Sequence, residues 1–492
     1  MKLLNARQIH DWDAFTIASE PVASIDLMER AARKCAEFIT DNYADACIKI
    51  FCAKGNNGGD GLAIARQLIE QGINPVIFIL ELGAMGTPDF QANLHRLHQL
   101  TTDIHFIQAN SFFPEINKED IVIDALYGSG LNRPLQQLSE ALVHHINDAK
   151  VTVVAIDVPS GMFIDKSSKG NAVIRATHTL TFQTLKLCLL AAENEGLFGT
   201  VTILDIGLDP KFSSTVEAKF TIAVHADIAG TYKPRKAFAH KGSFGHSLLI
   251  AGNPGKMGAA LLAAKACACT GTGLLTLSLP ENSMAVLHSY LPEAMTVPRH
   301  EKTDYQKYTA VGIGPGLGTN DDGKMLLQLL LHHYNRPVVF DADALNIMAL
   351  EPGMLQKIPA GSILTPHPKE FDRLAGEPAD EFERIDRALA MSQQFNCIVV
   401  LKGHHTLIAH NGRGWFNITG NAGLAKGGSG DVLTGMITAL LAQGYNSFDA
   451  ALLGVYLHGL AADIASKSIA MEAMLAGDVI GHISDAFFSI QV

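Results

Sequence analysis

Nearly continuous apolar runs alternate with longer amphipathic stretches through the first half of the chain. Runs without polar alternation are typical of strands buried on both faces of a parallel sheet, and the stretches between them have the length of helices. We predict strands at 48–54, 74–81, 120–128 and 150–161, and helices at 5–19, 24–42, 58–72 and 133–148. Strands separated by helices indicate a three-layer α/β domain, in which helices cover both faces of the sheet.

The same alternation returns in the second half, after a less regular segment. Beyond Gly207 the chain becomes polar and loses its periodicity, so we place a domain boundary near 215–235 and expect domains at 1–220 and 221–492. A second alternating run begins there, with apolar stretches and the turns that end them at 246–253, 274–280, 308–318, 336–345, 361–371 and 397–410, and helices at 258–273 and from about 430 onward. The predicted fold class is therefore α/β, with two three-layer domains.

Composition narrows the class of protein further. The 492 residues are 48% hydrophobic and carry a formal net charge of −11, which argues against a nucleic-acid partner because phosphate backbones require a basic surface. The seven cysteines are scattered and include no CxxC pair, so we expect free thiols in a reducing compartment and no structural zinc. The amphipathic N-terminus and the lack of a long uncharged run predict a cytoplasmic chain that does not enter a membrane.

A glycine-rich stretch, GNNGGDG at 55–61, follows the first long predicted strand and opens a helix. Ligands of open α/β sheets bind at the carboxyl ends of the strands, and free amides at a helix start favour anions. The stretch is neither a GxGxxG motif nor a P-loop. It predicts either a phosphate-binding turn or a tight turn in which Asp60 caps the helix.

Two neighbouring strand ends carry further acids. Asp124 ends one strand before a glycine-rich loop, and Asp157 and Ser160 end the next. Parallel strands would bring these side chains to one edge of the sheet, together with Asn57 and Asp60. Oxygen ligands of this kind suit a hard cation, with phosphate-binding turns beside it.

In the second half, GGSGD at 427–431 precedes a long helix. Glycine amides at a helix start can hold a transferring phosphoryl group, and a carboxylate there would repel the phosphates unless it had another role. The available role is that of general base, in which Asp431 accepts the proton of a hydroxyl that attacks phosphorus. A helix-capping role for Asp431 is compatible with this, because a cap is held at the mouth of the helix.

Other strand ends in this half predict contacts with a ligand. Lys402, Gly403 and Thr406 would lie near a nucleotide, and the glycine loop GIGPGLG at 312–318 suits close approach of a ligand.

For three side chains in this half, the sequence is compatible with two different roles. His367, in the Pro-bounded turn TPHPKEF, is either a substrate contact or a rigid-turn histidine. Asp341 and Asp343 either organise a magnesium–water network or satisfy loop backbone.

With these motifs the chain resembles the bifunctional NAD(P)H-hydrate repair enzymes, in which an epimerase domain is fused to an ADP- or ATP-dependent dehydratase domain. The epimerase half is matched by NNGGDG, DALYGSGL and DVPSG, and the dehydratase half, in family order, by KGSFGH, NPGKMGAA, GPGLG, DADAL, TPHPKEF, LKGHHT and GGSGD. The set covers nearly the whole chain and is specific as a set. Lys369 departs from the glycine expected in the TPHPKEF turn, which bears on the local loop shape more than on the activity.

The resemblance implies a Rossmann-like N-terminal domain, a ribokinase-like C-terminal domain, and roles by position. In the first domain the hydrated nucleotide would contact Asn56, Asn57, Gly58, Gly59, Asp60, Gly128, Ser129, Gly130, Leu131, Asn132, Arg133, Pro134 and Asp157. A potassium ion would be held by Asn57, Asp124 and Ser160. In the second domain the hydrated nicotinamide would contact Ala260, Gly316, Gly318, His367 and Asp431. ADP, with magnesium, would contact Lys402, Gly403, His404, His405, Thr406, Gly427, Gly428, Ser429 and Gly430.

The implied activity is repair of hydrated NADH and NADPH. The first domain would interconvert the R and S epimers, with Asp157 as acid and base, and the second would dehydrate the S epimer at the expense of ADP, with Asp431 as base. We expect the hydrates and ADP as small-molecule partners, and a homo-oligomer. One alternative is a vitamin or sugar kinase, which leaves the first domain unexplained. The other is a non-catalytic scaffold, which leaves the acids at the strand ends unexplained.

Overall fold

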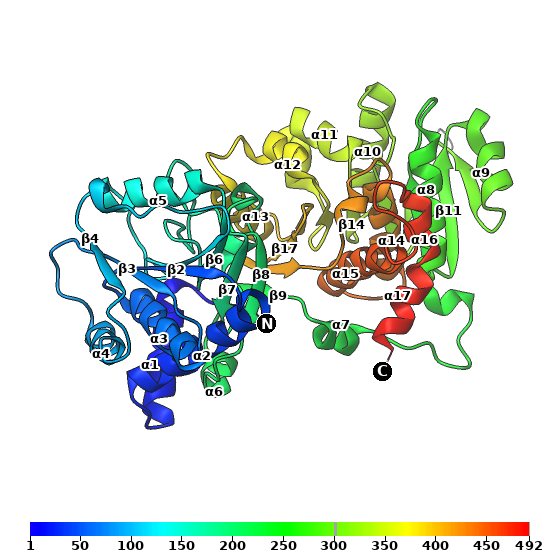
Figure 1. The fold of residues 1–492 in the computed structure, drawn as a ribbon. Helices are drawn as coiled ribbons and strands as arrows, with labels where there is room; N and C mark the ends of the chain where they lie inside the picture. Colours follow the sequence, from blue (N-terminus) through cyan, green and yellow to red (C-terminus); the bar gives the residue numbers. More distant parts are fainter. Residues whose placement is uncertain (300–302, 492) are drawn as a thin grey trace. The chain divides into compact units, whose positions relative to one another are not determined.

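The computed structural model describes residues 1–299 and 303–491, and the chain forms two compact units (Figure 1). The N-terminal unit comprises Lys2–Ala218 together with the short segment Asp380–Phe382, and the C-terminal unit comprises the rest of the chain. Each unit is an α/β structure with its own sheet, as the alternation of apolar runs and helical stretches predicts.

The N-terminal sheet is parallel throughout and has the strand order β4-β3-β2-β5-β6-β7-β8. Its strands are β2 (Cys47–Cys52), β3 (Val76–Leu80), β4 (Ile104–Ile107), β5 (Asp120–Ala125), β6 (Thr152–Ile156), β7 (His178–Phe182) and β8 (Thr200–Leu204). The chain runs outward from β2 to β4 and then returns to β5 on the other side of β2. The order therefore reverses between β2 and β5, which is where an open α/β sheet leaves a crevice for a ligand.

Helices cover both faces of this sheet, as Figure 1 shows. One hydrophobic cluster joins α2 and α3 to one face, and a second joins α5 to the other. The other elements of the unit are β1 (Lys2–Leu3), α1 (Ala6–Ser19), α2 (Ser24–Tyr43), α3 (Asn56–Glu70), α4 (Pro88–Leu97), α5 (Gln137–Ala149) and α6 (Pro210–Thr215). The predicted helix at 58–72 begins earlier, at Asn56, and β4, β7 and β8 are strands that the apolar pattern did not predict.

The sheet strands that belong to the C-terminal unit have the order β9-β18-β17-β16-β15-β14-β13-β10-β11-β12. Its strands are β9 (Phe220–Ile222), β10 (His246–Ile250), β11 (Leu274–Leu279), β12 (Met295–Pro298), β13 (Ala310–Ile313), β14 (Val338–Phe340), β15 (Ile363–Leu364), β16 (Ile398–Leu401), β17 (Thr406–His410) and β18 (Arg413–Asn417). Neighbours pair in parallel except along β16, β17 and β18, which are antiparallel. The order reverses between β10 and β13, so this sheet also has a crevice at its carboxyl edge.

The C-terminal helices also form two layers around their sheet. α14 packs closely on α8, where a Cβ on Gly435 would lie 2.1 Å from the carbonyl oxygen of Ala263, so only glycine fits this crossing. The helices are α7 (His225–Thr231), α8 (Met257–Thr270), α9 (Met284–Tyr290), α10 (Asp321–His333), α11 (Asp343–Leu350), α12 (Pro368–Ala375), α13 (Glu381–Gln394), α14 (Ser429–Ala442), α15 (Ser447–Ala465), α16 (Ala476–Gly481) and α17 (Ile483–Ile490).

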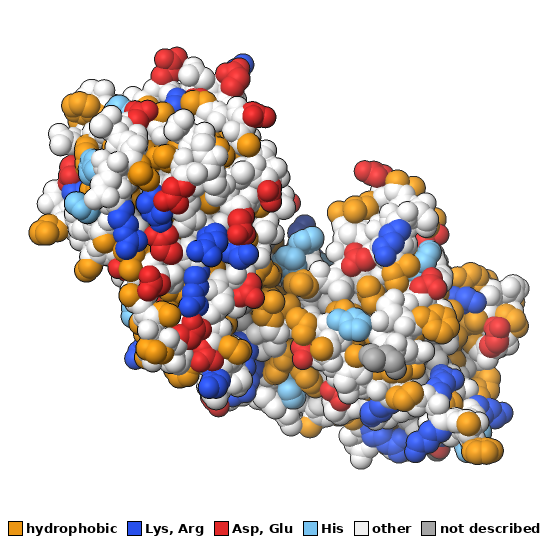
Figure 2. Space-filling model, turned by 60° about the horizontal axis from the view of Figure 1, so that its bottom comes forward, with side chains coloured by type: hydrophobic (Ala, Val, Ile, Leu, Met, Phe, Trp, Pro, Cys, Tyr) orange, Lys and Arg blue, Asp and Glu red, His pale blue; other side chains and the backbone are white. Residues whose placement is uncertain are grey.

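One helix in the described part of the chain, α15, is long and apolar enough to cross a bilayer by length and composition. Its most apolar window is 72% buried inside the protein, and its side chains belong to the hydrophobic cluster that also contains α14. α15 is therefore a core helix in this structure. On the face shown in Figure 2, acidic and basic side chains are interspersed with scattered apolar ones.

Candidate functional site

The carboxyl ends of β5 and β6 place Asp124 and Ser160 in direct contact. The Asp124 carboxylate is fully buried and accepts hydrogen bonds from the Ser160 hydroxyl at 2.6 Å and from the Ser160 backbone amide at 2.8 Å. The Ser160 hydroxyl in turn accepts a hydrogen bond from the backbone amide of Tyr127. Burial raises the pKa of Asp124 to about 6, although the hydrogen bonds from Ser160 oppose this shift.

The chemistry around Asp124 fits a monovalent cation. Asn57 and Ser160 contribute neutral oxygens, and the carboxylate of Asp124 supplies a single charge whose ionised form a cation would stabilise. The buried side-chain nitrogen of Asn57 has no hydrogen-bond partner among the described residues. This N–H group is a donor, so it suits an oxygen of a bound nucleotide rather than the cation itself. Within the described residues, no cluster of three or more His, Cys, Asp or Glu side chains is arranged to hold a metal ion.

Asp157 lies directly after β6 and is held on both sides. One carboxylate oxygen pairs with the ammonium of Lys186 at 2.8 Å, and the other accepts the backbone N–H of Ser129 at 2.8 Å. The backbone of Asp157 is left-handed, with φ 69°, which is uncommon for a residue other than glycine and which aims the side chain toward the loop after β5. Burial alone would raise the pKa of Asp157, but Lys186 and Ser129 outweigh burial and lower it. Asp157 is therefore held ionised.

The GNNGGDG stretch is the first turn of α3 rather than a loop before it. A Cβ on Gly58 would lie 1.5 Å from the carbonyl oxygen of Ala53, so this glycine allows the helix to start immediately over the strand end. Asp60 is half-buried, and its pKa is raised well above the ordinary value by burial and then by Asp157 and Asp13. Its carboxylate has no hydrogen-bond partner within the described residues, so Asp60 does not cap α3, whose N-cap is Gly55.

The structure therefore brings most of the predicted epimerase residues to one edge. A Cβ on Gly128 would lie 3.0 Å from an oxygen of Asp157 and 3.1 Å from the side-chain oxygen of Asn57, which places the β5 loop against the start of α3. The remainder of this loop is partly or fully exposed and comprises Ser129, Gly130, Leu131, Asn132, Arg133 and Pro134. Asn56 is exposed at the start of α3, while Gly59 is buried beneath it.

Two groups of this edge were not predicted from the sequence. Lys186 is the charged partner of Asp157, and the available signal was a lysine inside the apolar run LKLCLLAA. Asp13 on α1 is half-buried, and burial together with Asp157 raises its pKa to about 6. No local pattern distinguishes Asp13 from the other polar residues of its amphipathic helix.

In the C-terminal unit, Asp431 lies in the first turn of α14. The N-cap is Gly428, with φ 99°, and it offers no side chain to the first amides of the helix. These amides and the helix dipole are therefore free to hold an anion. Burial, followed by repulsion from Asp341, raises the pKa of Asp431 to about 7, while Lys402 lowers it in part. A carboxylate with this pKa can accept a proton near neutral pH.

Lys402 follows β16 and contacts acidic side chains that follow β14 and β15, near the start of α14. Its ammonium pairs with Asp341, after β14, at 2.8 Å, and lies 3.9 Å from Glu370, after β15. The other oxygen of Asp341 accepts the hydroxyl of Thr434 at 2.7 Å, one turn along α14 from Asp431. Burial lowers the pKa of Lys402, but Asp341 and Glu370 outweigh burial and raise it, so the lysine remains a cation.

The glycine loop after β13 is built against neighbouring strand ends. Gly314, with φ 132°, has no room for a Cβ because the carbonyl oxygen of Asp341 would lie 1.8 Å away. The amide of Gly318 donates to Asp343 at 2.8 Å, so Asp343 satisfies loop backbone, one of the two roles expected for it. Gly316 is partly exposed, whereas Ala260 is fully buried on α8.

His367 is engaged within its own turn. Its ring accepts the amide of Glu370 at 3.3 Å, and its own amide donates to the Glu370 carboxylate at 2.9 Å, so the two residues cap α12 reciprocally. The ring remains exposed. The structure thus supports the rigid-turn reading of His367, and a substrate contact is still open to the exposed ring.

The predicted nucleotide loops lie at the same edge as Lys402. Gly403, His404 and His405 form the β16–β17 turn, closed by hydrogen bonds between Gly403 and Thr406. The second loop comprises the partly or fully exposed Gly427, Gly428, Ser429 and Gly430. A Cβ on Gly430 would lie 3.2 Å from the Lys402 ammonium, so the lysine approaches the helix start closely.

One further residue at this helix mouth was not predicted. His458, buried on α15, has a ring nitrogen 3.4 Å from the Ser429 hydroxyl. Burial and the nearby Lys402 lower the pKa of His458 to about 4, so it is neutral at physiological pH. A lone histidine within the apolar helix α15 was the only sequence signal.

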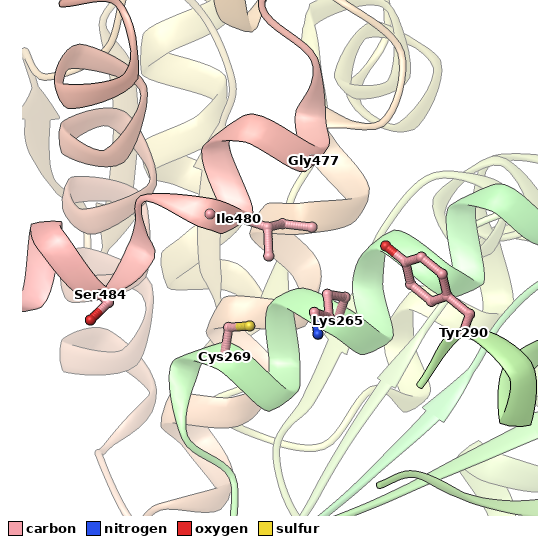
Figure 3. A pocket seen from close by; sticks show the side chains of 7 residues that line it. Lys265, Cys269, Tyr290, Gly477, Ile480 and Ser484 are labelled. Carbon is pink, nitrogen blue, oxygen red and sulfur yellow. The ribbon is translucent and has the colours of Figure 1, made fainter. Parts of the chain in front are cut away.

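A cavity of about 320 Å³ lies elsewhere in the C-terminal unit, between α8, α9, α16 and α17 (Figure 3). Its lining comprises Lys265, Cys269, Tyr290, Gly477, Ile480, Gly481 and Ser484. None of the predicted site residues is among them.

Comparison with known proteins identifies the fold class of the C-terminal unit. The C-terminal unit belongs to the ribokinase-like class: a ribokinase-like superfamily protein from Enterococcus faecalis aligns over 56% of this chain and 98% of its own, with a TM-score of 0.51 and 26% identity. An ADP/ATP-dependent NAD(P)H-hydrate dehydratase from Bacillus subtilis, crystallised with ATP and Mg²⁺, aligns over 55% of this chain and 99% of its own, with a TM-score of 0.50 and 32% identity.

Family models match both halves of the chain. Residues 24–188 match the model of the YjeF-related protein N-terminus, and residues 247–484 match that of NAD(P)H-hydrate dehydratase. The bifunctional NAD(P)H-hydrate repair enzyme of Moorella thermoacetica is 33% identical over 98% of this chain and 96% of its own length. The chain belongs to the family of bifunctional NAD(P)H-hydrate repair enzymes.

Proposed function

We propose that the protein restores NADH and NADPH from their hydrates through the residues described above, by epimerisation in the N-terminal unit and ADP-dependent dehydration in the C-terminal unit. The observation that carries the proposal is the half-buried carboxylate of Asp431, with a pKa of about 7, at a helix start whose amides lack a side-chain cap. A base and an anion site side by side are what phosphoryl transfer to a hydroxyl requires.

Dehydration requires the C6 hydroxyl of the hydrate to be converted into a better leaving group. The hydrate carries a hydroxyl at C6 of the nicotinamide ring, and hydroxide leaves poorly. Asp431 takes the hydroxyl proton as the oxygen attacks the terminal phosphorus of ADP, and the phosphorus–oxygen bond to AMP breaks. The ring nitrogen lone pair then expels phosphate from C6, and loss of a C5 proton restores NADH or NADPH. The products are the reduced nucleotide, AMP and phosphate.

The residues around Asp431 bind the nucleotide and neutralise the charge of its phosphates. The amides of Ser429 and Gly430 bind the terminal phosphate, and Lys402, held by Asp341, neutralises charge on it. The turn from Gly403 to Thr406 and the loop from Gly427 to Gly430 hold the nucleotide. Magnesium, bound with the nucleotide, would supply further charge neutralisation to the phosphates.

Epimerisation requires C6 to become planar, and this moves a proton to or from its oxygen. We assign this transfer to Asp157, which is held ionised beside the loop after β5. The hydrated nucleotide binds between that loop and the first turn of α3. Asn57, Asp124 and Ser160 would hold potassium, which would supply positive charge to this edge of the sheet.

We also propose that the protein acts as a homo-oligomer in the cytoplasm. The seven cysteines are free thiols, as expected in a reducing compartment. Exposed apolar side chains in the C-terminal unit, among them Leu475 and Phe488, offer surface for association. Light scattering on the purified protein measures the oligomeric state, and a monomer at all concentrations contradicts this part.

The test of the function uses the epimeric mixture of hydrated NADPH with ADP. We expect recovery of the reduced-nicotinamide absorbance in step with equal amounts of AMP and phosphate, and consumption of both epimers. A vitamin or sugar kinase would instead leave the absorbance unchanged and phosphorylate an added alcohol to a stable product. Recovery limited to the S epimer would contradict the assignment of the N-terminal unit.

A further inference from the structure

Lys186 is one of the most deeply buried charged side chains of the protein. Its side chain is 1% exposed, and its ammonium contacts the Asp157 carboxylate at 2.8 Å, the Thr181 hydroxyl at 2.7 Å and the Phe182 carbonyl at 2.9 Å. An ammonium has three protons to donate, and all three find a partner here. Burying a charged lysine is costly unless it is paired and hydrogen-bonded in this way.

The chain after β7 is shaped to bring this lysine back over the strand ends. Gln183 adopts a left-handed backbone, with φ 61°, and its side-chain oxygen accepts the amide of Ile206 at 3.1 Å. Thr184 closes the turn through its amide, which donates to the Phe182 carbonyl. The side chain of Lys186 then folds back onto β7, where Thr181 and Phe182 fix its ammonium beside Asp157.

We infer that Lys186 is a positioning residue of the epimerase site, which orients Asp157 so that its second oxygen stays turned toward the Gly128–Ser129 loop. The inference rests on the proposed role of Asp157 in epimerisation. The lysine binds one carboxylate oxygen, and the other lies 3.0 Å from the place a Gly128 Cβ would occupy. Lys186 itself is enclosed by protein and acts through Asp157 rather than on the substrate.

The acidic side chains near Asp157 make the positive charge of Lys186 necessary to keep Asp157 ionised. Two further carboxylates face Asp157 from neighbouring elements, Asp13 from α1 and Asp60 from α3, and both have raised pKa values because of burial and of Asp157. Lys186 is the cation that offsets these acids at Asp157. Without it, Asp157 would face two acids in a buried site and would take up a proton at higher pH.

The test compares Lys186→Met with a matched buried ion pair. Lys49 of β2 pairs with Asp120 at the start of β5, whereas Asp124 near the end of β5 belongs to the proposed site, so Lys49→Met breaks a similar pair away from that edge. We expect Lys186→Met to lower the epimerisation kcat on the order of 10²-fold and to move the acid limb of its pH profile up by about one unit or more. We expect Lys49→Met to lower thermal stability but to keep the wild-type pH profile.

Additional variants separate the inference from the proposed function. Asp157→Asn is measured first: full epimerisation in this variant overturns the role of Asp157 itself. If Asp157→Asn is inactive and Lys186→Met keeps the wild-type kcat and pH profile, the positioning role is overturned. In the Asp157→Asn background, Lys186→Met should remove no further activity.

A second substitution keeps the inference testable if Lys186→Met does not fold. Thr181→Val retains the ion pair but removes one of the contacts that hold the ammonium. We expect the same upward shift of the acid limb with a smaller amplitude. An unchanged pH profile in Thr181→Val, with Lys186→Met unfolded, overturns the inference.

Discussion

Replacing Asp431 by asparagine should stabilise the C-terminal unit at neutral and alkaline pH while removing the proposed base. Asp431 has a raised pKa because the fold holds it half-buried near Asp341, so its charged form is unfavourable in the folded protein. Asparagine has nearly the same shape and carries no charge. A carboxylate with a strongly perturbed pKa is typical of a functional site.

The magnitude follows from the pKa shift. The pKa rises from 3.8 to about 7, and each unit corresponds to about 1.4 kcal/mol, which gives an upper limit of about 4 kcal/mol. Asp431 is partly exposed, so solvent screening reduces this to about 2 kcal/mol. A raised carboxyl pKa means that the folded state binds the proton more tightly than the unfolded state. The wild type therefore loses stability as pH rises from 3.8 toward 7, and the variant does not.

The assay is urea unfolding followed by tryptophan fluorescence in a Trp12→Phe background. The chain has two tryptophans, and the remaining Trp415 lies in β18 with its ring 4.5 Å from that of Phe448, so it reports on the C-terminal unit. We expect the stability of Asp431→Asn relative to wild type to be greater at about pH 7 than at about pH 5, and to level off above the folded-state pKa. Asp485→Asn, at an exposed position on α17, serves as the control and should show a difference that does not change with pH.

Two results would refute this reasoning. If the stability difference between Asp431→Asn and wild type is the same at both pH values, Asp431 has no raised pKa in the folded protein. If the variant becomes less stable than wild type as pH rises, the carboxylate is stabilised by partners, and its role as a neutral-pH base loses its physical basis.

Three further predictions concern the two sites. Asp341→Asn removes a negative charge and frees Lys402 to approach Asp431, so the acid limb of the dehydration profile should move down by about one pH unit or more; a pH titration of kcat that leaves it in place contradicts the assigned network. Gly430→Ala would press on the Lys402 ammonium at 3.2 Å and should weaken ADP binding by about tenfold, which calorimetry measures; unchanged affinity contradicts the close approach. Replacing potassium salts by tetramethylammonium salts should slow epimerisation, and Asp124→Asn should raise the potassium concentration needed for half the maximal rate by about tenfold or more; epimerisation indifferent to potassium contradicts this site.

The general architecture and the strand-end residues could be predicted from the sequence because their signals are local. Apolar runs define the parallel strands, and residues directly after a strand must lie at its carboxyl edge whatever the rest of the fold does. Asp124 and Asp157 were identified in this way, and the structure places both at strand ends. Asp431 was identified from the glycine-rich stretch before a long helix, and the structure places it in the first turn of α14.

The contacts that tune these residues could not be predicted, because they join distant parts of the chain. The Lys186–Asp157 pair and the Lys402–Asp341 pair both depend on how loops after different strands return over the sheet. The need for glycine at position 58 also depends on tertiary packing. The sequence suggested that this glycine gives a phosphate access to the backbone, whereas the structure shows that Ala53 leaves no room for a side chain there. β4, β7 and β8 were missed because their short runs lack a long apolar stretch.

The central claim is that Asp431 accepts the proton of the C6 hydroxyl while the neighbouring amides hold the donor phosphate. The most direct measurement is a single turnover of the S epimer of hydrated NADPH with ADP by the Asp431→Asn variant, together with its affinity for ADP. We predict that the rate of reduced-nucleotide recovery falls on the order of 10³-fold while the ADP dissociation constant stays within about threefold of wild type. Recovery at close to the wild-type rate would contradict the account.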